Sequence, residues 1–371
     1  MKFSFSSEQE EFRSNLRRLL ADRSPTKEVR RLMETDQGYE RDGWRAINNA
    51  LSLTAIRIPE AYGGYGFGFG DQCIVLEEMG RALLCAPYFA TAVLAAGAVM
   101  NAGTEAEKEA LLPGIAAGET AATLAWVEDN GRWDAERTAL TATAERGEFL
   151  LNGTKSYVID GHTADLIVVL ARALQGLSLF SVDGNAAGLT RRTLKSMDPT
   201  RKFARLEFNR VAARPLGTVG GAAAPFARTM VEAVVCLANE MVGGADRLRE
   251  DALAYAMMRM QFGKPIASFQ SMKHKHADML LDVELAKSAA YHAAAAAADD
   301  DADLPALASL AKAAASEAYL QTAIHTIQIH GGIGFTWDND THLWFKHAKA
   351  SEVFLGDPTW HREQLMQRWG H

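Results

Sequence analysis

The sequence predicts an α+β protein in which a helical part, a small β domain and a second helical part follow one another. Apolar residues recur at helical spacing up to about residue 118 and again after Pro225. Between these parts, short runs of Thr, Val and aromatic residues alternate with polar residues and end at Gly or Asp, which is typical of strands. Because helices and strands are segregated along the chain, we expect domains over residues 1–118, 119–222 and 223–371.

The N-terminal part begins with a helix signal at Ser7, a capping residue type that is followed by glutamates in the first turn. The apolar residues after it lie at helical spacing: Phe12, Leu16, Leu19 and Leu20. A glycine-rich loop is expected over residues 58–66. Further helices are expected over residues 71–83, 90–101 and 105–112.

The middle part is expected to form strands at five short segments: residues 122–127, 148–151, 165–170, 177–182 and 204–208. Asn152 and Gly153 form the residue pair that favours a tight hairpin turn. In the C-terminal part, the alanine tract over residues 293–298 predicts a helix, and the aspartate-rich segment after it predicts an exposed loop.

Composition excludes several classes of function. Lys and Arg number 39 and Asp and Glu number 46, so the net charge is −7, which disfavours binding to nucleic acid or to anionic membranes. The cysteines Cys73, Cys85 and Cys236 lack CxxC spacing, so we expect buried thiols in a reducing compartment. We expect no membrane span and no signal segment, and therefore a cytoplasmic protein.

The histidines do not indicate a metal site. His274 and His276 lie two residues apart on an expected helix, so they point to different faces, and His325 and His330 lack the spacing of a ligand pair. His342, His347 and His361 have no carboxylate at motif spacing, so we expect no metal.

Two C-terminal segments contain residue types that bind phosphate groups. One runs from Arg259 to Ile266 and continues to Phe269 and Gln270; the other runs over residues 328–335. A Gly-Gly-x-Gly turn lets backbone N–H groups approach an anion closely, and an arginine offers a fork of donors. A glycine-rich turn is also a common helix C-cap, so either segment by itself leaves both interpretations open.

Together, these segments and the three-part order resemble the acyl-CoA dehydrogenase family from Phe5 to His361. The family's loop "PEEYGG-G" corresponds to residues 59–66 and its strand pair "NG-K-WI-NG" to residues 152–161. Its segments "R-FG-PI--FQ" and "Q--GG-G" correspond to residues 259–270 and 328–334. The resemblance implies this family's fold, with a small middle β-barrel or sandwich and a C-terminal four-helix bundle.

The resemblance also implies FAD-dependent dehydrogenation of an acyl-CoA thioester between Cα and Cβ, with electron-transfer flavoprotein as the electron acceptor. In the family the flavin lies at a dimer interface, so we expect a homodimer or tetramer, or a heteromer with a paralogous subunit. The residues expected to hold the neighbour's flavin nucleotide are Arg259, Phe262, Gln270, Gln328, Gly331, Gly332 and Gly334. Tyr157 and Ile159 take the positions that contact the flavin ring.

The chain departs from the family where the catalytic base lies, because Leu355 occupies that position. Some members carry the base on an earlier helix, at the position of Ala233. Glu240 lies seven residues after Ala233, so it projects from the same helix face, among apolar residues that would raise its pKa. Glu240 is therefore the candidate base, or else a buried carboxylate satisfied by a neighbouring helix or subunit. Glu352 and Asp357 flank the lost site but are expected to point away from it.

The contacts expected around the flavin ring are also altered. The family's small Gly-Ser pair is replaced by Arg132 and Trp133, and Ile159 lacks the hydroxyl of the family's threonine. Three hypotheses follow: an active dehydrogenase with Glu240 as base, a catalytically silent partner subunit, or an oxidase or monooxygenase on the same scaffold. Residues 197–201 and 357–362 resemble the branch that acts on bulky steroid side-chain thioesters, in which two different subunits share one flavin site.

Overall fold

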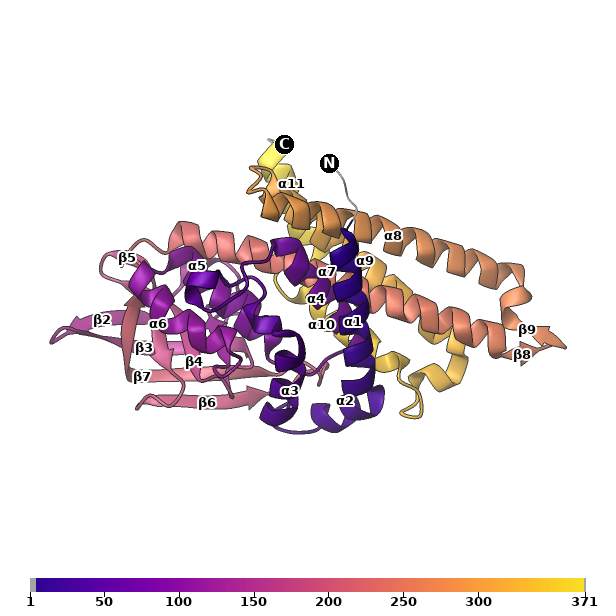
Figure 1. Cartoon of the computed structure of the whole chain (residues 1–371), viewed down its shortest axis with the longest axis horizontal. Coiled ribbons are helices and arrows are strands. Elements are labelled where there is room, and N and C mark those ends of the chain that lie inside the picture. The colour runs from indigo at the N-terminus through magenta and orange to yellow at the C-terminus, as the bar shows by residue number, and fades with distance from the viewer. Residues whose placement is uncertain (1–4, 370–371) are drawn as a thin grey trace. The chain divides into compact units, whose positions relative to one another are not determined.

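The computed structural model describes residues 5–369, whose elements are labelled in Figure 1. The N-terminal part is helical, as predicted. Its elements are α1 (Ser7–Arg23), α2 (Thr26–Met33), α3 (Arg41–Leu51), short 3-10 turns at Leu53–Ala55 and Glu60–Tyr62, α4 (Phe69–Ala82), a π-helical segment (Phe89–Ala95), α5 (Ala96–Ala102) and α6 (Glu105–Ala116).

The cap of α1 is Ser6, so the expectation that Ser7 caps this helix is wrong by one residue. Ser6 Oγ accepts a hydrogen bond from Gln9 N at 3.2 Å, and Gln9 Oε1 accepts one from Ser6 N at 3.1 Å. This reciprocal capping box satisfies two backbone donors at the start of the helix.

The middle part is a closed β-barrel. Its strands are β1 (Ala122–Ala125), β2 (Thr141–Glu145), β3 (Glu148–Ile159), β4 (Leu166–Ala173), β5 (Gly176–Asp183), β6 (Leu189–Leu194) and β7 (Phe203–Leu216). Hydrogen bonds run in the order β4-β2-β3-β7-β5 and return from β5 to β4, which closes the ring. Strand β1 extends the sheet from β4, and β6 extends it from β7. The core is apolar, with Leu151, Val169, Phe180 and Leu206 fully buried.

The expected hairpin turn at Asn152 and Gly153 is wrong, because both residues lie inside β3. The turn that joins β2 to β3 contains Arg146 and Gly147, with φ values of 51° and 87°. Asn152 instead marks a register shift between β3 and β7, where its Oδ1 accepts a hydrogen bond from Arg210 N at 2.9 Å. Leu151 pairs with Val211 and Asn152 with Asn209, so the unpaired residue is Arg210, and the bulge lies in β7 opposite Asn152.

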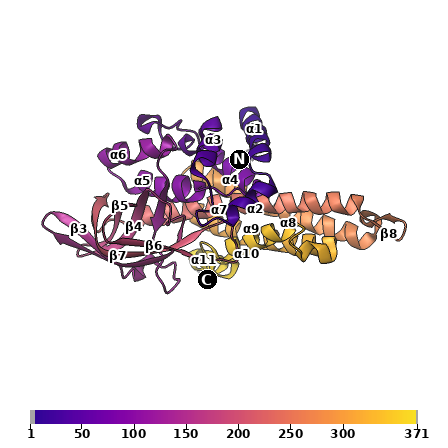
Figure 2. The same cartoon turned by 90° about the horizontal axis from the view of Figure 1, so that it is seen from below.

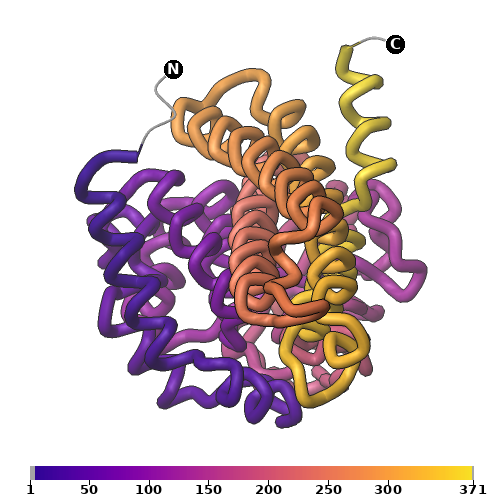
Figure 3. Tube along the Cα trace, turned by 90° about the vertical axis from the view of Figure 1, so that its right-hand side faces the viewer, coloured from indigo at the N-terminus to yellow at the C-terminus, as the bar shows by residue number. Residues whose placement is uncertain are grey.

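The C-terminal part is a bundle of long helices. Its elements are α7 (Ala223–Met258), β8 (Met260–Gln261), β9 (Lys264–Pro265), a 3-10 turn (Ile266–Ser268), α8 (Gln270–Ala298), α9 (Leu304–His330), a 3-10 turn (Gly331–Phe335), α10 (Thr341–Val353) and α11 (Pro358–Trp369). Helices α8 and α9 lie side by side (Figure 3). The alanine tract ends α8, and the aspartate-rich loop after it is largely exposed, as predicted.

The chain divides into two compact units. The bundle unit contains the chain up to Val29, Phe69–Leu84 and the chain from Val234 onwards, and the barrel unit contains Arg30–Gly68 and Cys85–Ala233. Cys73, Cys85 and Cys236 are buried and form no disulfide. None of the helices described over residues 5–369 combines the length and apolar character needed to cross a membrane.

Candidate functional site

The residues of the Arg259–Gln270 segment lie around a small hairpin between α7 and α8, at one end of the bundle unit (Figure 2). Gln261 pairs with Lys264, and the two residues between them have positive φ values, 52° at Phe262 and 77° at Gly263. These values are typical of a type I′ turn, which costs a non-glycine residue about 1–2 kcal/mol. The turn presents the Phe262 ring to solvent, with the residue 89% exposed.

The Gly331–Gly334 turn ends α9 close to this hairpin. Tyr255, one turn before Arg259, stacks on His330 with ring centroids 4.2 Å apart. Gly331 N donates to Gln328 O, so Gly331 is the C-cap of α9, with φ 69°. The C-cap interpretation of this turn is therefore correct for Gly331, and it leaves the exposed face of the turn available.

The surface formed by these residues fits a phosphate-bearing cofactor. A Cβ added to Gly331 or Gly332 would meet nothing within 4 Å, so the backbone there is open to close approach. The exposed Arg259 guanidinium has no hydrogen bond or ion pair within residues 5–369. Gln270 is exposed, and Gln328 Oε1 accepts a hydrogen bond from Lys275 Nζ at 3.0 Å. An open glycine turn beside an unpaired guanidinium is the donor set that a pyrophosphate requires.

The residues expected to contact the flavin ring lie in the barrel unit, where one is buried and the other is exposed. Ile159 is 2% exposed, and its carbonyl accepts a hydrogen bond from Thr123 Oγ1 at 2.6 Å. Tyr157 is 46% exposed, with φ 56°. Ile159 is therefore engaged within the barrel, whereas the exposed Tyr157 hydroxyl forms no hydrogen bond within residues 5–369.

The loop that replaces the family's Gly-Ser pair is fixed by a buried ion pair. Lys155 is fully buried, and its Nζ lies 2.9 Å from Glu128 Oε1. Burial lowers the pKa of Lys155 to about 8 although Glu128 opposes that shift. Glu128 also accepts hydrogen bonds from the backbone N–H groups of Ala139 and Leu140, which closes the loop over residues 128–140. No local sequence pattern predicted this pair, because 27 residues separate Glu128 from Lys155.

The turn at the position of the family's catalytic base is rigid and apolar. Leu355 is 5% exposed and has φ 61°, and Gly356 has φ 100°. Lys312, fully buried in α9, donates hydrogen bonds to the carbonyls of Glu352 and Gly356 at 3.0 and 2.9 Å. His361 Nε2 donates to Leu355 O at 3.0 Å, and burial lowers the pKa of His361 to about 4. The Leu355 side chain offers no group that accepts a proton.

Glu240 lies in α7 of the bundle unit and is 9% exposed. Its Oε1 lies 3.5 Å from Nε2 of His347 in α10. Its backbone contacts α4 so closely that a Cβ on Gly80 would lie 2.0 Å from Glu240 O. The structure thus places a buried Glu–His pair in the helix bundle. The partner was missed because more than 100 residues separate the two along the chain.

The other carboxylates near the expected site have structural partners. Glu232 is buried and ion-paired with Arg57 and Arg228, each at 2.8 Å. Asp357 Oδ1 accepts a hydrogen bond from Trp360 N at 2.8 Å at the start of α11, and Glu352 is ion-paired with Lys349. Within residues 5–369, no group of three or more His, Cys, Asp or Glu side chains is placed to hold a metal ion.

Family models for acyl-CoA dehydrogenases match almost the whole chain. The N-terminal, middle and C-terminal domain models match residues 6–119, 123–211 and 224–370. Acyl-CoA dehydrogenase IpdE2 of Mycobacterium tuberculosis is 31% identical over 95% of this chain and 94% of its own.

Solved structures are similar over the same length. A variant of the Tcur3481-Tcur3483 steroid ACAD is 30% identical over 97% of both chains, with a TM-score of 0.88. The ChsE4-ChsE5 complex from Mycobacterium tuberculosis is 25% identical over 100% of this chain and 99% of the matched chain, with a TM-score of 0.91.

Proposed function

The chain belongs to the acyl-CoA dehydrogenase family, and on that premise we propose that it is the supporting subunit of an FAD-dependent acyl-CoA dehydrogenase made of two different chains. In this role it holds the flavin nucleotide across the interface, and its partner supplies the catalytic base. The observation that carries the proposal is Leu355, because an aliphatic side chain at the base position cannot remove a proton.

The chemistry of the reaction divides between the cofactor and the protein. FAD, when bound, supplies the acceptor for the hydride that leaves Cβ. Arg259 would neutralise the pyrophosphate, the open backbone at Gly331 and Gly332 would allow its close approach, and the exposed Phe262 ring would cover the adenosine. None of these groups is required to exchange a proton, so a chain with this set contributes binding without contributing a base.

Two comparisons support a heteromer and a bulky substrate. The Tcur3481-Tcur3483 steroid ACAD and the ChsE4-ChsE5 complex each name two different chains. The first is also named for steroids, which agrees with the resemblance of residues 197–201 to the bulky-substrate branch. We therefore propose a steroid-type acyl-CoA thioester as the substrate and electron-transfer flavoprotein as the electron acceptor.

A second candidate function is a self-sufficient dehydrogenase in which Glu240 is the base. The observation that favours it is the Glu240–His347 pair, because the Glu240 side chain retains 11% exposure and an imidazole beside a carboxylate relays protons well. In this case His347 would position Glu240 and receive the proton taken from the substrate.

The ratio of FAD to chain distinguishes the two functions. The purified chain is saturated with FAD, desalted and measured by visible absorption, alone and after co-expression with a paralogous subunit. Little flavin alone, and about one FAD per two chains with the paralogue, supports the supporting subunit. One FAD per chain, with bleaching by an acyl-CoA that Glu240→Gln abolishes, supports the second candidate. Absence of flavin in both preparations contradicts both.

Two further measurements complete the test. Arg259→Ala is expected to lower FAD retention, whereas the matched control Arg362→Ala removes a surface guanidinium of α11 that pairs with Glu317 and leaves retention unchanged. Oxygen consumption in proportion to substrate would instead identify an oxidase or monooxygenase.

A further inference from the structure

A cavity of about 290 Å³ lies in the bundle unit, away from the residues assigned to the flavin. Its wall combines side chains of α1, α4, α7 and α10, including Arg17, Arg81, Arg247, Glu78, Leu20 and Trp344. Arg247 precedes Arg259 by twelve residues on α7 and its continuation, which corresponds to about 18 Å along a helix. The cavity is therefore a separate feature, and the inference below does not depend on the proposed function.

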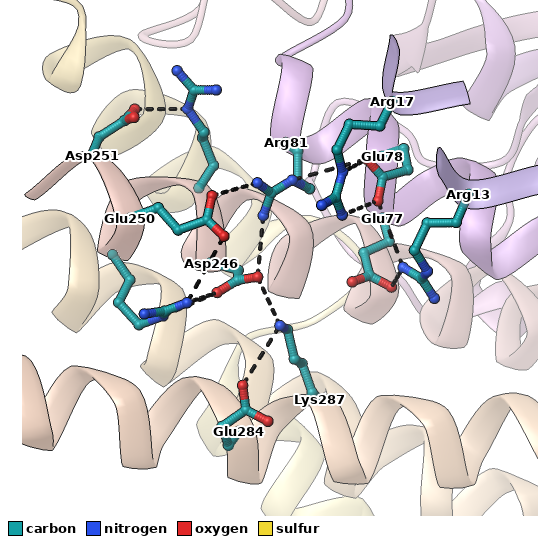
Figure 4. Close-up of polar contacts among 12 residues, drawn as sticks. Arg13, Arg17, Glu77, Glu78, Arg81, Asp246, Glu250, Asp251, Glu284 and Lys287 are labelled. Atoms are coloured by element: carbon teal, nitrogen blue, oxygen red, sulfur yellow. Dashed lines mark hydrogen bonds and ion pairs between the residues drawn. The ribbon is translucent and has the colours of Figure 1, made fainter. Parts of the chain in front are cut away.

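The carboxylates at this cavity are already neutralised by an ion-pair network (Figure 4). Glu78 is 1% exposed, and both of its oxygens accept hydrogen bonds from Arg17, at 2.8 and 2.6 Å. Arg81 donates to Asp246 at 3.1 Å and to Glu250 at 2.5 Å. Glu78, the one carboxylate in the cavity wall, is thus fully engaged, and the wall has no negative charge left to attract a cation.

Donor groups at the same wall remain unused. Arg17 uses its Nε and Nη2 for Glu78, and Arg247 uses its Nε for Asp251 Oδ2 at 2.8 Å. Neither guanidinium forms another hydrogen bond or ion pair within residues 5–369, so Nη1 of Arg17 and both Nη groups of Arg247 carry unused N–H groups. Trp344 is 4% exposed, and its indole N–H has no acceptor in the same part of the chain.

The buried indole N–H of Trp344 costs free energy while it lacks an acceptor. The unused N–H groups of Arg17 and Arg247 are charged donors at the same wall, and an anionic acceptor forms the strongest hydrogen bonds with such donors. The remaining wall is mixed: Leu20 and the Trp344 ring are apolar, and Ser24 and Thr26 carry hydroxyl groups. A ligand that matches this wall therefore needs an anionic head with several acceptor oxygens and a short apolar body. The volume lies at the lower end of small-molecule pockets, which span about 300–1,000 Å³, so the ligand is small.

We propose that this cavity binds a small organic anion, a carboxylate or phosphate monoester whose oxygens accept hydrogen bonds from Arg17, Arg247 and Trp344. The ligand would connect α1 to α7 and α10, because each of these helices supplies one of the donors. Binding would therefore stabilise the bundle unit and raise its melting temperature as the ligand concentration rises.

The test uses the full chain and two probes, phenyl phosphate and benzoate, measured by isothermal titration calorimetry and thermal melting. We expect saturable binding of at least one probe with a Kd of about 1 mM or tighter, and the stronger probe identifies the head group. Inorganic phosphate serves as a third titrant, and its weaker binding would show that the apolar wall contributes.

Two variants locate the site. Arg247→Gln is expected to weaken binding by at least about tenfold, because it removes charge-assisted hydrogen bonds. Trp344→Phe keeps the ring, removes the indole N–H and is expected to weaken binding several-fold. The control is Arg362→Gln, since Arg362 is 53% exposed against 44% for Arg247 and also forms one surface ion pair.

The proposal is overturned if neither probe binds saturably at millimolar concentration. It is also overturned if Arg362→Gln weakens binding as much as Arg247→Gln, because the effect would then be bulk electrostatics. If Arg247→Gln does not fold, unchanged binding in Trp344→Phe overturns the assignment of the site.

Discussion

Removing the charge of Lys312 should loosen the turn that contains Leu355 and Gly356. Lys312 Nζ donates to Ser316 Oγ at 3.0 Å and to the carbonyls of Glu352 and Gly356 at 3.0 and 2.9 Å. Hydrogen bonds from a charged donor contribute about 1.5–3 kcal/mol each. The variant Lys312→Met loses all three but also removes the desolvation cost of a fully buried ammonium, several kcal/mol. The expected net decrease in the stability of the turn is about 2–4 kcal/mol.

Hydrogen exchange measured by mass spectrometry is the suitable assay, because a chain with two compact units need not unfold in one step. A loss of about 2 kcal/mol corresponds to roughly 30-fold faster exchange through local opening. We expect this increase in peptides that cover residues 350–361, where Phe354 N bonds to Ala350 O and His361 N to Asp357 O.

The control is Lys349→Met, which removes a lysine that is 45% exposed and pairs with the Glu352 side chain from outside. Its expected cost is below about 1 kcal/mol. Unchanged exchange over residues 350–361 in Lys312→Met, or a rise in its melting temperature, would refute the reasoning that Lys312 fixes the turn.

Four further outcomes are expected. Because native His361 has a pKa of about 4 instead of 6.5, the unfolded chain binds the extra proton, so stability falls as the pH drops from 6.5 to 4. At pH 5 this lowers the free energy of unfolding by about 2 kcal/mol. In His361→Gln the melting temperature should lose this part of its pH dependence. Glu77→Gln removes one member of a buried ion pair and should cost about 3 kcal/mol in thermal unfolding. Gly80→Ala places a methyl 2.0 Å from Glu240 O and should lower the melting temperature by forcing α4 from α7. In Gly332→Ala the added methyl group would meet no atom within 4 Å, so the melting temperature should not change. FAD retention should fall, because the methyl group would occupy the space through which the pyrophosphate approaches the backbone.

The order of helical, β and helical parts could be predicted because each part repeats one hydrophobic period over many residues. The alanine tract of α8 and the five predicted strand segments were located for this reason, each segment lying within an observed strand or overlapping one. Strands β2 and β6 were not predicted, and β3 extends eight residues beyond its predicted end. The hairpin turn expected at Asn152 and Gly153 was wrong because this residue pair lies inside β3, opposite a bulge in β7. Pairing with β7, a strand far along the chain, decides between them.

The candidate site was predictable only where its residues are close in sequence. Local motifs singled out the segment around Phe262 and the glycine turn after α9, but the hairpin formed by β8 and β9 was not predicted. The contacts of Glu240 with His347, and of Lys312 with the Leu355 turn, join segments that only tertiary packing brings together. Residue spacing gives information only about neighbours within one helix, strand or turn. Neither of these contacts between distant segments could therefore be predicted from spacing.

The end of α7 and the hairpin after it form an apolar tip of the bundle unit, which affects a newly synthesised chain before it assembles. Four of its side chains are 53–89% exposed: Met257, Met258, Met260 and Phe262. In the proposed assembly a partner covers this tip, and encounter is a second-order process. With a partner concentration of about 1 µM and an association rate constant of roughly 10⁵–10⁶ M⁻¹ s⁻¹, each tip remains exposed to solvent for about 1–10 s. The cell must therefore synthesise both chains in step, since a chain in excess keeps a surface that chaperones and proteases recognise.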